Sequence, residues 1–411
     1  IVFYAVGLYD LRRLWRLPVL LNNVLGASAV NFLAGIAFFY FFYPFKAVGL
    51  TPKTHLVLVA AITPVLVFAW RRAVLGAFSM TQLRQRVGFL GAAQHLREIR
   101  RDLRRHAWLG YVPVRCRWPG VDLVVADGRW VDRNWERARP MLEEIVRHRV
   151  PVLDLPTFYE GLFGKVLLAH AASASWLFGS VLVRTGHWYH PVKRALDLAA
   201  GSLLLLLAAP VLAVLGLLCL AVQGGPVFFV QERVGRGGRT FTMWKLRTMR
   251  EAGGAAGPFG RNGGRTSRVT RLGGFLRRWR LDELPQLWNV LRGEMSLVGP
   301  RPEWTKEVEV LRTAIPHYEL RHLLRPGMTG WAQLNFRATS DPRDSLEKFR
   351  FDLYYLQHLS LNLDLAILLR TARRLAQRDA AVPPGRRRLG FTERDAALAA
   401  NLGALLKRRR G

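Results

Sequence analysis

The sequence has 411 residues, which allows two or three domains. It carries 61 Lys and Arg against 29 Asp and Glu, a net charge of +32, so polyanions such as lipid head groups, nucleotide phosphates or nucleic acid are expected neighbours. The only cysteines, Cys116 and Cys219, lie far apart, which excludes a disulfide framework and a cysteine-based metal site.

The first 82 residues predict a membrane region. Residues 18–43 contain no charge and end in the aromatic cluster Phe38–Tyr43, a pattern typical of a transmembrane helix with an interfacial belt. A shorter apolar run at 55–70 predicts a second helix. Arginines on the outer side of both runs favour a hairpin with both flanks in the cytoplasm.

Residues 83–156 predict a small parallel α/β sheet. Apolar runs at Val87–Gly91, Asp122–Gly128 and Val150–Pro156 indicate strands, and His95–His106 and Trp135–Val146 have helical character. This alternation of strands and helices is typical of a Rossmann-like arrangement.

The glycine fingerprint of a dinucleotide site fails in this segment. If Gly91 is the first glycine, Ala93 and Leu96 occupy the other two positions, and no carboxylate follows at the spacing that would hold a ribose. A structural or regulatory domain is therefore favoured over cofactor binding. Residues 157–192 are interpreted as a linker to the membrane surface, with core packing of their aromatic residues as the alternative.

The most apolar stretch is Leu198–Val222, which contains no charge. Pro210 interrupts it, and basic residues flank both ends, so the pattern predicts a re-entrant helix over 195–222 that bends at Pro210 and leaves by the side it entered. An ordinary kinked transmembrane helix is the alternative.

An acidic pair, Asp282–Glu283, stands among the arginines Arg277, Arg278 and Arg280. Such a field is expected to lower both carboxyl pKa values and keep the pair ionised. An ionised carboxylate there can serve as a nucleophile, a Mg²⁺ ligand or an ion-pair partner, and spacing alone favours the ion pair.

Five ordered motifs carry a resemblance to a known family. They are QERVGRGG (231–238), FTMWKLRTM (241–249), RLDELPQLWNVLRGEMSLVGPRP (280–302), RPGMTGWAQLN (325–335) and KFRFDLYYL (348–356). Over about 192–375 the chain resembles the bacterial sugar transferases, monotopic phosphoglycosyl transferases that load a sugar-1-phosphate onto a polyprenyl phosphate. The preceding part resembles the long members, which have transmembrane helices and a degenerate Rossmann-like domain.

The resemblance implies a membrane α/β protein with a mainly helical catalytic domain over 193–375 and a basic tail over 376–411. Long members have about four N-terminal transmembrane helices. Because only two are predicted here and the chain opens on Ile1, further residues are expected upstream.

The resemblance also assigns roles. Asp282 would attack the β-phosphorus of a UDP-sugar and release UMP, and a polyprenyl (undecaprenyl) phosphate would then take the phosphosugar from its carboxylate. Asp282 and Glu283 would lie beside Mg²⁺. Residues implied to bind substrate or phosphate are Lys245, Arg277, Arg301, Arg325, Gln333, Asn335, Asp352 and Tyr355, and Pro210 would break the membrane helix.

Three positions depart from the family pattern: Ala209 replaces a common serine, Glu294 a common aspartate, and Phe336 precedes Arg337 where Gly-Arg is frequent.

The expected function is the initiating step of exopolysaccharide or O-antigen synthesis at the bacterial inner membrane, with the catalytic domain facing the cytoplasm. Expected partners are a UDP-sugar, polyprenyl phosphate and membrane lipids, without nucleic acid and with a possible homo-oligomer. The alternatives are a membrane-tethered NAD-dependent nucleotide-sugar epimerase or dehydratase, and a basic membrane scaffold without enzymatic activity.

Overall fold

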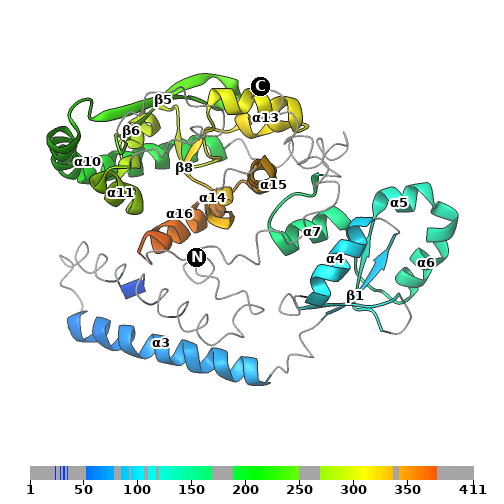
Figure 1. The fold of residues 1–411 in the computed structure, drawn as a ribbon. Helices are drawn as coiled ribbons and strands as arrows, with labels where there is room; N and C mark the ends of the chain where they lie inside the picture. Colours follow the sequence, from blue (N-terminus) through cyan, green and yellow to red (C-terminus); the bar gives the residue numbers. More distant parts are fainter. Residues whose placement is uncertain are drawn as a thin grey trace. The chain divides into compact units, whose positions relative to one another are not determined.

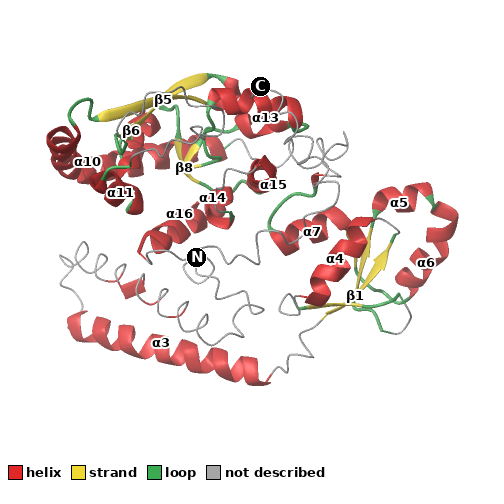
Figure 2. Cartoon of the chain, in the orientation of Figure 1, coloured by secondary structure: helices red, strands yellow, loops and turns green. Residues whose placement is uncertain are grey.

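The computed structural model describes residues 24, 28, 31–32, 35, 52–77, 85–91, 94–105, 110–116, 120–168, 188–249, 269–336 and 342–376. The chain divides between Phe163 and Gly164 into two compact units, each of which is described by itself (Figures 1 and 2). The predicted helix over 18–43, five isolated positions excepted, and the basic tail from residue 377 lie outside the described residues.

The second N-terminal helix is present as α3 (Pro52–Ala77), which includes the predicted 55–70. Its apolar part, Ala61–Trp70, is short. A stretch of that length does not by itself predict a membrane span.

The first unit contains a parallel sheet of four strands in the order β2-β1-β3-β4. The three predicted strands are confirmed. The strand that the sequence missed, β2, has three residues and no fully buried side chain, so it leaves no apolar run to recognise. The strands are β1 (Gln85–Leu90), β2 (Tyr111–Pro113), β3 (Leu123–Ala126) and β4 (Val152–Asp154).

Helices cover both faces of this sheet (Figure 1). On one face lie α4 (Gln94–Arg105) and α7 (Leu155–Phe163), where Phe158 meets Phe89 of β1 with 6.2 Å between ring centroids. On the other lie α5 (Gly128–Arg133) and α6 (Trp135–Arg147). The alternation of helices is expected for parallel strands joined by right-handed crossovers.

Two sequence interpretations fall on this unit. Leu96, at the third position of the failed glycine fingerprint, is buried in the core. Helix α7 extends into the segment interpreted as a linker and buries Phe158 and Tyr159, while residues 169–187 of that segment lie outside the described part.

The second unit is built along α10 (Tyr189–Gln223), a helix of 35 residues. It begins six residues before the predicted 195–222 and continues through Pro210 as one helix. Within the described residues it is the one helix long and apolar enough to cross a membrane, by length and composition. One face of the helix is exposed and apolar, with leucines such as Leu203, Leu206 and Leu207.

After α10 the chain forms an antiparallel hairpin of β5 (Phe228–Val234) and β6 (Thr240–Leu246), with the short turn η3 (Arg236–Gly238) at its tip. Short helices follow, and the parallel pair β7–β8 (Ser296–Val298 and Gly327–Thr329) brings two loops together. These loops touch so closely that a Cβ on Gly299 would lie 2.4 Å from the carbonyl oxygen of Arg325. The helices are α11 (Arg271–Arg278), η5 (Leu281–Glu283) and α12 (Gln286–Arg292).

Helices also complete the core of this unit. Leu346, Phe349 and Leu353 of α15 are buried against Val308 and Leu311 of α13. The unit is therefore mainly helical, as the resemblance implies. The elements are α13 (Thr305–Ala314), η6 (Tyr318–Leu323), α14 (Trp331–Asn335), α15 (Pro342–Gln357) and α16 (Leu361–Ala376).

Candidate active site

The acidic pair lies in the tight turn η5 between two helices. Arg280, just before η5, has φ 55°, a left-handed conformation that is uncommon for a residue with a side chain. Pro285 then starts α12 from a helical φ of −60°. Because the turn folds back at Arg280, Asp282 becomes buried and only 8% exposed.

Glu283 is surrounded by cations. Its carboxylate oxygens lie 3.2 Å from Nη1 of Arg280, 3.6 Å from Nζ of Lys245 and 3.6 Å from Nη2 of Arg301. Burial alone would raise the pKa of Glu283, but Arg301, Lys245 and Arg280 outweigh it and hold that pKa at about 2. Glu283 is thus the ion-pair partner that spacing favoured.

Asp282 has different surroundings. No ion pair to its carboxylate occurs among the described residues. Burial raises its pKa, the neighbouring Glu283 raises it further, and Lys245 and Arg277 only oppose this. The expectation that the arginines lower both carboxyl pKa values is therefore wrong for Asp282, because desolvation outweighs cations that lie beyond contact distance.

Lys245 reaches the acidic pair from β6, where it pairs with Phe229. Burial lowers its pKa to about 8, Arg301 acts in the same direction, and the two acids raise it. A buried lysine among arginines loses its proton more easily than an exposed one.

Arg277 stands in the last turn of α11, five residues before Asp282. Its Nε donates a hydrogen bond of 2.8 Å to Oγ1 of Thr248, which directly follows β6. The contact is possible because Gly273 has no side chain: a Cβ there would lie 2.0 Å from the carbonyl oxygen of Thr248. The sequence motifs included Thr248 but gave no signal for this role.

Arg301 is held by its loop as well as by Glu283. Its carbonyl oxygen accepts a 2.9 Å hydrogen bond from Nη2 of Arg321, and Nη1 of Arg233 donates to the neighbouring Pro302 carbonyl at 3.2 Å. Sequence reasoning missed both arginines, because a contact with a backbone carbonyl does not depend on the residue type that supplies the carbonyl.

Asp352 does not contact the acidic pair. It is buried on α15, where it accepts a 2.8 Å hydrogen bond from Nη2 of Arg321. Burial raises its pKa to about 6, against the opposing effect of Arg321. The same nitrogen of Arg321 also donates to the Arg301 carbonyl, so Asp352 holds the Arg301 loop in place through Arg321.

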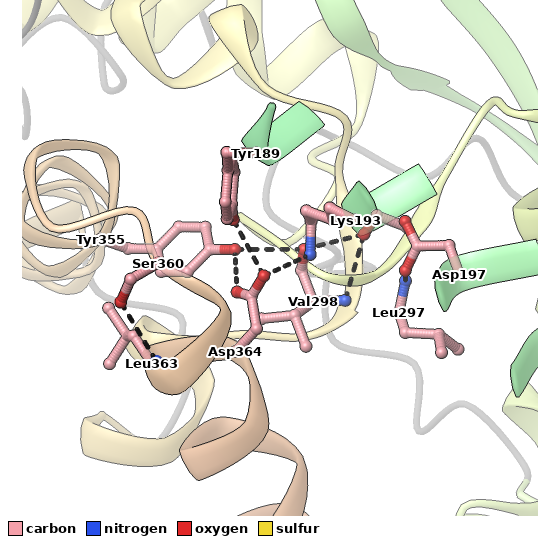
Figure 3. Close-up of polar contacts among 10 residues, drawn as sticks. Tyr189, Lys193, Asp197, Leu297, Val298, Tyr355, Ser360, Leu363 and Asp364 are labelled. Carbon is pink, nitrogen blue, oxygen red and sulfur yellow. Dashed lines mark hydrogen bonds and ion pairs between the residues drawn. The ribbon is translucent and has the colours of Figure 1, made fainter. Parts of the chain in front are cut away.

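Tyr355 lies one turn further along α15 and faces another cluster. Its hydroxyl donates to Oδ1 of Asp364 at 2.5 Å, and Asp364 Oδ2 accepts from Tyr189 and Lys193 of α10 at 2.9 Å each (Figure 3). Arg325 lines an open pocket beside this cluster. The structure therefore separates Tyr355 and Arg325 from the acidic pair.

The last two predicted residues lie on α14. Nδ2 of Asn335 donates to the Trp331 carbonyl at 2.9 Å, and the Gln333 carbonyl accepts from Nη1 of Arg374 at 3.0 Å. Nε2 of Gln333 is buried without a hydrogen-bond partner. Arg337 lies outside the described residues.

The acidic pair can be tested as a metal site. Within the described residues no group of three His, Cys, Asp or Glu side chains could hold a metal ion. Mg²⁺, however, is commonly held by one or two carboxylates together with substrate phosphates. Asp282, which has no ion pair with the described residues, fits that requirement, and the adjacent Glu283 offers a second carboxylate that already pairs with three cations.

Comparison with known proteins agrees with this architecture. A model of the family "Bacterial sugar transferase" matches residues 188–378. An N-acetylgalactosaminephosphotransferase of Aeromonas hydrophila, which acts on undecaprenyl phosphate, is 38% identical over 255 residues, 61% of this chain and 58% of its own length.

Two UDP-glucose:undecaprenyl-phosphate glucose-1-phosphate transferases are also similar. The protein from Xanthomonas campestris is 31% identical over 325 residues, 71% of this chain and 66% of its own length. The protein from Caulobacter vibrioides is 44% identical over 195 residues, 46% of this chain and 71% of its own length. The chain thus spans less than two thirds of the Aeromonas protein's length, but it covers 71% of the Caulobacter protein at 44% identity: it belongs to the bacterial sugar transferase family.

Proposed function

We propose that this chain transfers a sugar-1-phosphate from a UDP-sugar to polyprenyl phosphate, with Asp282 as the nucleophile. A carboxylate oxygen of Asp282 attacks the β-phosphorus, the bond from that phosphorus to the bridging oxygen breaks, and UMP leaves. A phosphate oxygen of the acceptor then attacks the same phosphorus, and Asp282 leaves as a carboxylate. The named relatives carry out the overall reaction on undecaprenyl phosphate.

The contrast within the acidic pair carries this proposal. Glu283 has its charge balanced by three cations, whereas Asp282 is buried beside it and forms no ion pair with the residues that the structure describes. A desolvated carboxylate that no cation neutralises is a better nucleophile than a paired one, and a burial-raised pKa is typical of functional sites.

The surrounding cations suit phosphoryl transfer, which depends on positioning and charge stabilisation more than on acid–base chemistry. Lys245, Arg277 and Arg301 would bind the phosphate oxygens of the substrate. Asp282 and Glu283 would hold Mg²⁺, which when bound neutralises charge on the transferred group.

The packing of α10 supports the re-entrant topology and a site at the membrane surface. Near its start, Nη1 of Arg194 donates to the Val290 carbonyl at 2.7 Å. Near its end, Cys219 is buried against Leu246 and Leu276. Both ends of α10 therefore contact the rest of the second unit. Because arginines flank both ends of the apolar stretch, we propose that both ends lie on one side of the bilayer, the cytoplasmic side of the inner membrane.

The test is release of UMP by the purified protein from a panel of UDP-sugars, with polyprenyl phosphate and Mg²⁺. Without the acceptor, a UDP-sugar labelled in its β-phosphate should leave label on the wild-type protein and none on Asp282→Asn. Arg239→Gln, which changes an exposed arginine at the hairpin tip, is the control and should keep both activities. Turnover by Asp282→Asn near the wild-type rate would exclude the covalent route.

The same panel separates the two alternatives. An NAD-dependent epimerase or dehydratase would change the sugar without releasing UMP, and a scaffold would do neither. The sugar that supports the fastest UMP release identifies the donor. We propose that the product initiates exopolysaccharide or O-antigen synthesis.

A further inference from the structure

A second cationic site lies at the first turn of α10, in an open pocket between this helix, η3 and the loop after η6. The helix contributes His190 and Lys193, the hairpin tip contributes Arg236, and the loop contributes Arg325. Positive side chains from three separate elements therefore line one pocket.

The carboxylates of this pocket already have partners. Asp364, behind it, accepts hydrogen bonds from Tyr189, Lys193 and Tyr355. Asp197, in its lining, accepts a 3.0 Å hydrogen bond from the backbone nitrogen of Leu297 (Figure 3). Lys193 balances the charge of Asp364, so Asp197 is the one carboxylate in this lining that acts on the guanidinium groups.

Arg236 and Arg325 make no side-chain hydrogen bond or ion pair with the described residues. Their guanidinium groups nevertheless lie near each other. Burial lowers the pKa of Arg325, and Arg194 and Arg236 lower it further, with Asp197 acting in the opposite direction. The two guanidinium groups outnumber Asp197, the one carboxylate of this lining, and so leave a net positive charge for an anionic ligand. Paired guanidiniums match the geometry of a phosphate.

This pocket is separate from the acidic pair. Its lining includes none of the cations that reach Asp282 or Glu283, and Arg236 and Arg325 are absent from the charges that shift the pKa of either acid. A phosphate held here is therefore not the one that reacts.

Apolar groups adjoin the charged pocket. Leu323, which lines it, is 47% exposed. Trp188, directly before the lining residue Tyr189, and Leu196, directly before the lining residue Asp197, are 62% and 53% exposed. A ligand with an anionic head and an apolar tail would contact both kinds of surface, and the most apolar helix begins at this point. We propose that this pocket binds the phosphate head group of an anionic membrane phospholipid.

Direct binding tests the proposal without depending on turnover. The full chain, purified in detergent, is titrated with dihexanoyl phosphatidylglycerol below its micelle concentration. Arg236→Gln and Arg325→Gln should each weaken saturable 1:1 binding about tenfold, because each removes a charge-assisted hydrogen bond. Arg239→Gln, at the same hairpin tip but outside the pocket, and Asp282→Asn should change the Kd less than about twofold.

Competition identifies the source of the phosphate. Inorganic phosphate and farnesyl phosphate should each displace the lipid only at much higher concentration. Farnesyl phosphate binding more tightly than the phospholipid would overturn the lipid assignment in favour of the acceptor. Equal weakening in Arg239→Gln, or displacement by a UDP-sugar, would overturn the pocket itself, by showing non-specific attraction or a part of the active site. None of these outcomes depends on whether Asp282 is the nucleophile.

Discussion

Asp282 and Asp364 are both buried carboxylates of the second unit, and their surroundings differ. Asp364 accepts hydrogen bonds from Tyr189, Tyr355 and Lys193 and so ties α10 to α15 and α16. Asp282 has no ion pair in the described part of the chain, and burial raises its pKa. A carboxylate that is paired with a cation and accepts several hydrogen bonds stabilises a fold, whereas one left without a cation is available for a substrate.

The largest effect on stability is expected at Asp364. Asp364→Asn would leave the half-buried Lys193 without its counter-ion and would weaken the hydrogen bonds from two buried tyrosines, so the free energy of unfolding should fall by about 3 kcal/mol. The same substitution at Asp282 removes a desolvated charge without a partner and should leave that free energy unchanged or raise it. Denaturant unfolding of both variants in detergent measures the difference. Equal losses at the two positions would break the comparison.

Ionised Glu283 should stabilise the folded state, and this contribution should be lost at low pH. The pKa of Glu283 is held at about 2, below the ordinary 4.5, so its ionised form stabilises the folded state above pH 4.5 and that contribution is lost as the pH falls towards 2. Glu283→Gln should cost about 2 kcal/mol at pH 7 and should flatten this part of the pH profile. Thermal unfolding between pH 2 and 6 checks it, and an unchanged profile in the variant would contradict it.

Lys245 should set the alkaline limit of UMP release. Its pKa is about 8, so the ammonium is present below that pH and lost above it, and turnover should fall several-fold as the pH rises from 7 to 9. Lys245→Arg keeps a cation at high pH and should move the alkaline fall in turnover to a higher pH. A limb that stays near pH 8 in this variant would assign the titration to another group.

The smallest effect is expected at Tyr355. Tyr355→Phe removes one of the three hydrogen bonds to Asp364 and should lower the free energy of unfolding by about 1 kcal/mol. In the Asp364→Asn background the same substitution should cost much less, because the accepting charge is already gone. Additive losses in this double-mutant cycle would show that Tyr355 acts elsewhere.

Patterning and motifs predicted much of this structure. Apolar runs located β1, β3 and β4, and the charge-free stretch after Leu198 located α10, because burial on a sheet or in a membrane imposes those compositions. The motif around Asp282 also located the acidic turn, since its residues are consecutive in the sequence.

The arrangement between distant segments could not be predicted in the same way. Asp352 and Tyr355 stand in one short motif, yet Asp352 bonds to Arg321 and Tyr355 to Asp364, because the face each presents depends on how α15 packs. Arg233 and Arg321 bind backbone carbonyls, a contact that residue types do not encode. The pKa of Asp282 likewise depends on burial, which the arginine-rich sequence conceals.

The absence of a side chain at Gly273 couples the position of the proposed nucleophile Asp282 to that of the phosphate-binding Arg277. Helix α11 rests directly on the Thr248 backbone, and both Arg277 and the turn that carries Asp282 extend from it. A methyl group at this position, as in Gly273→Ala, would clash with the Thr248 backbone and push α11 away from it. Asp282 and Arg277 would then shift together, so the affinity for the UDP-sugar and the rate of UMP release would both decline.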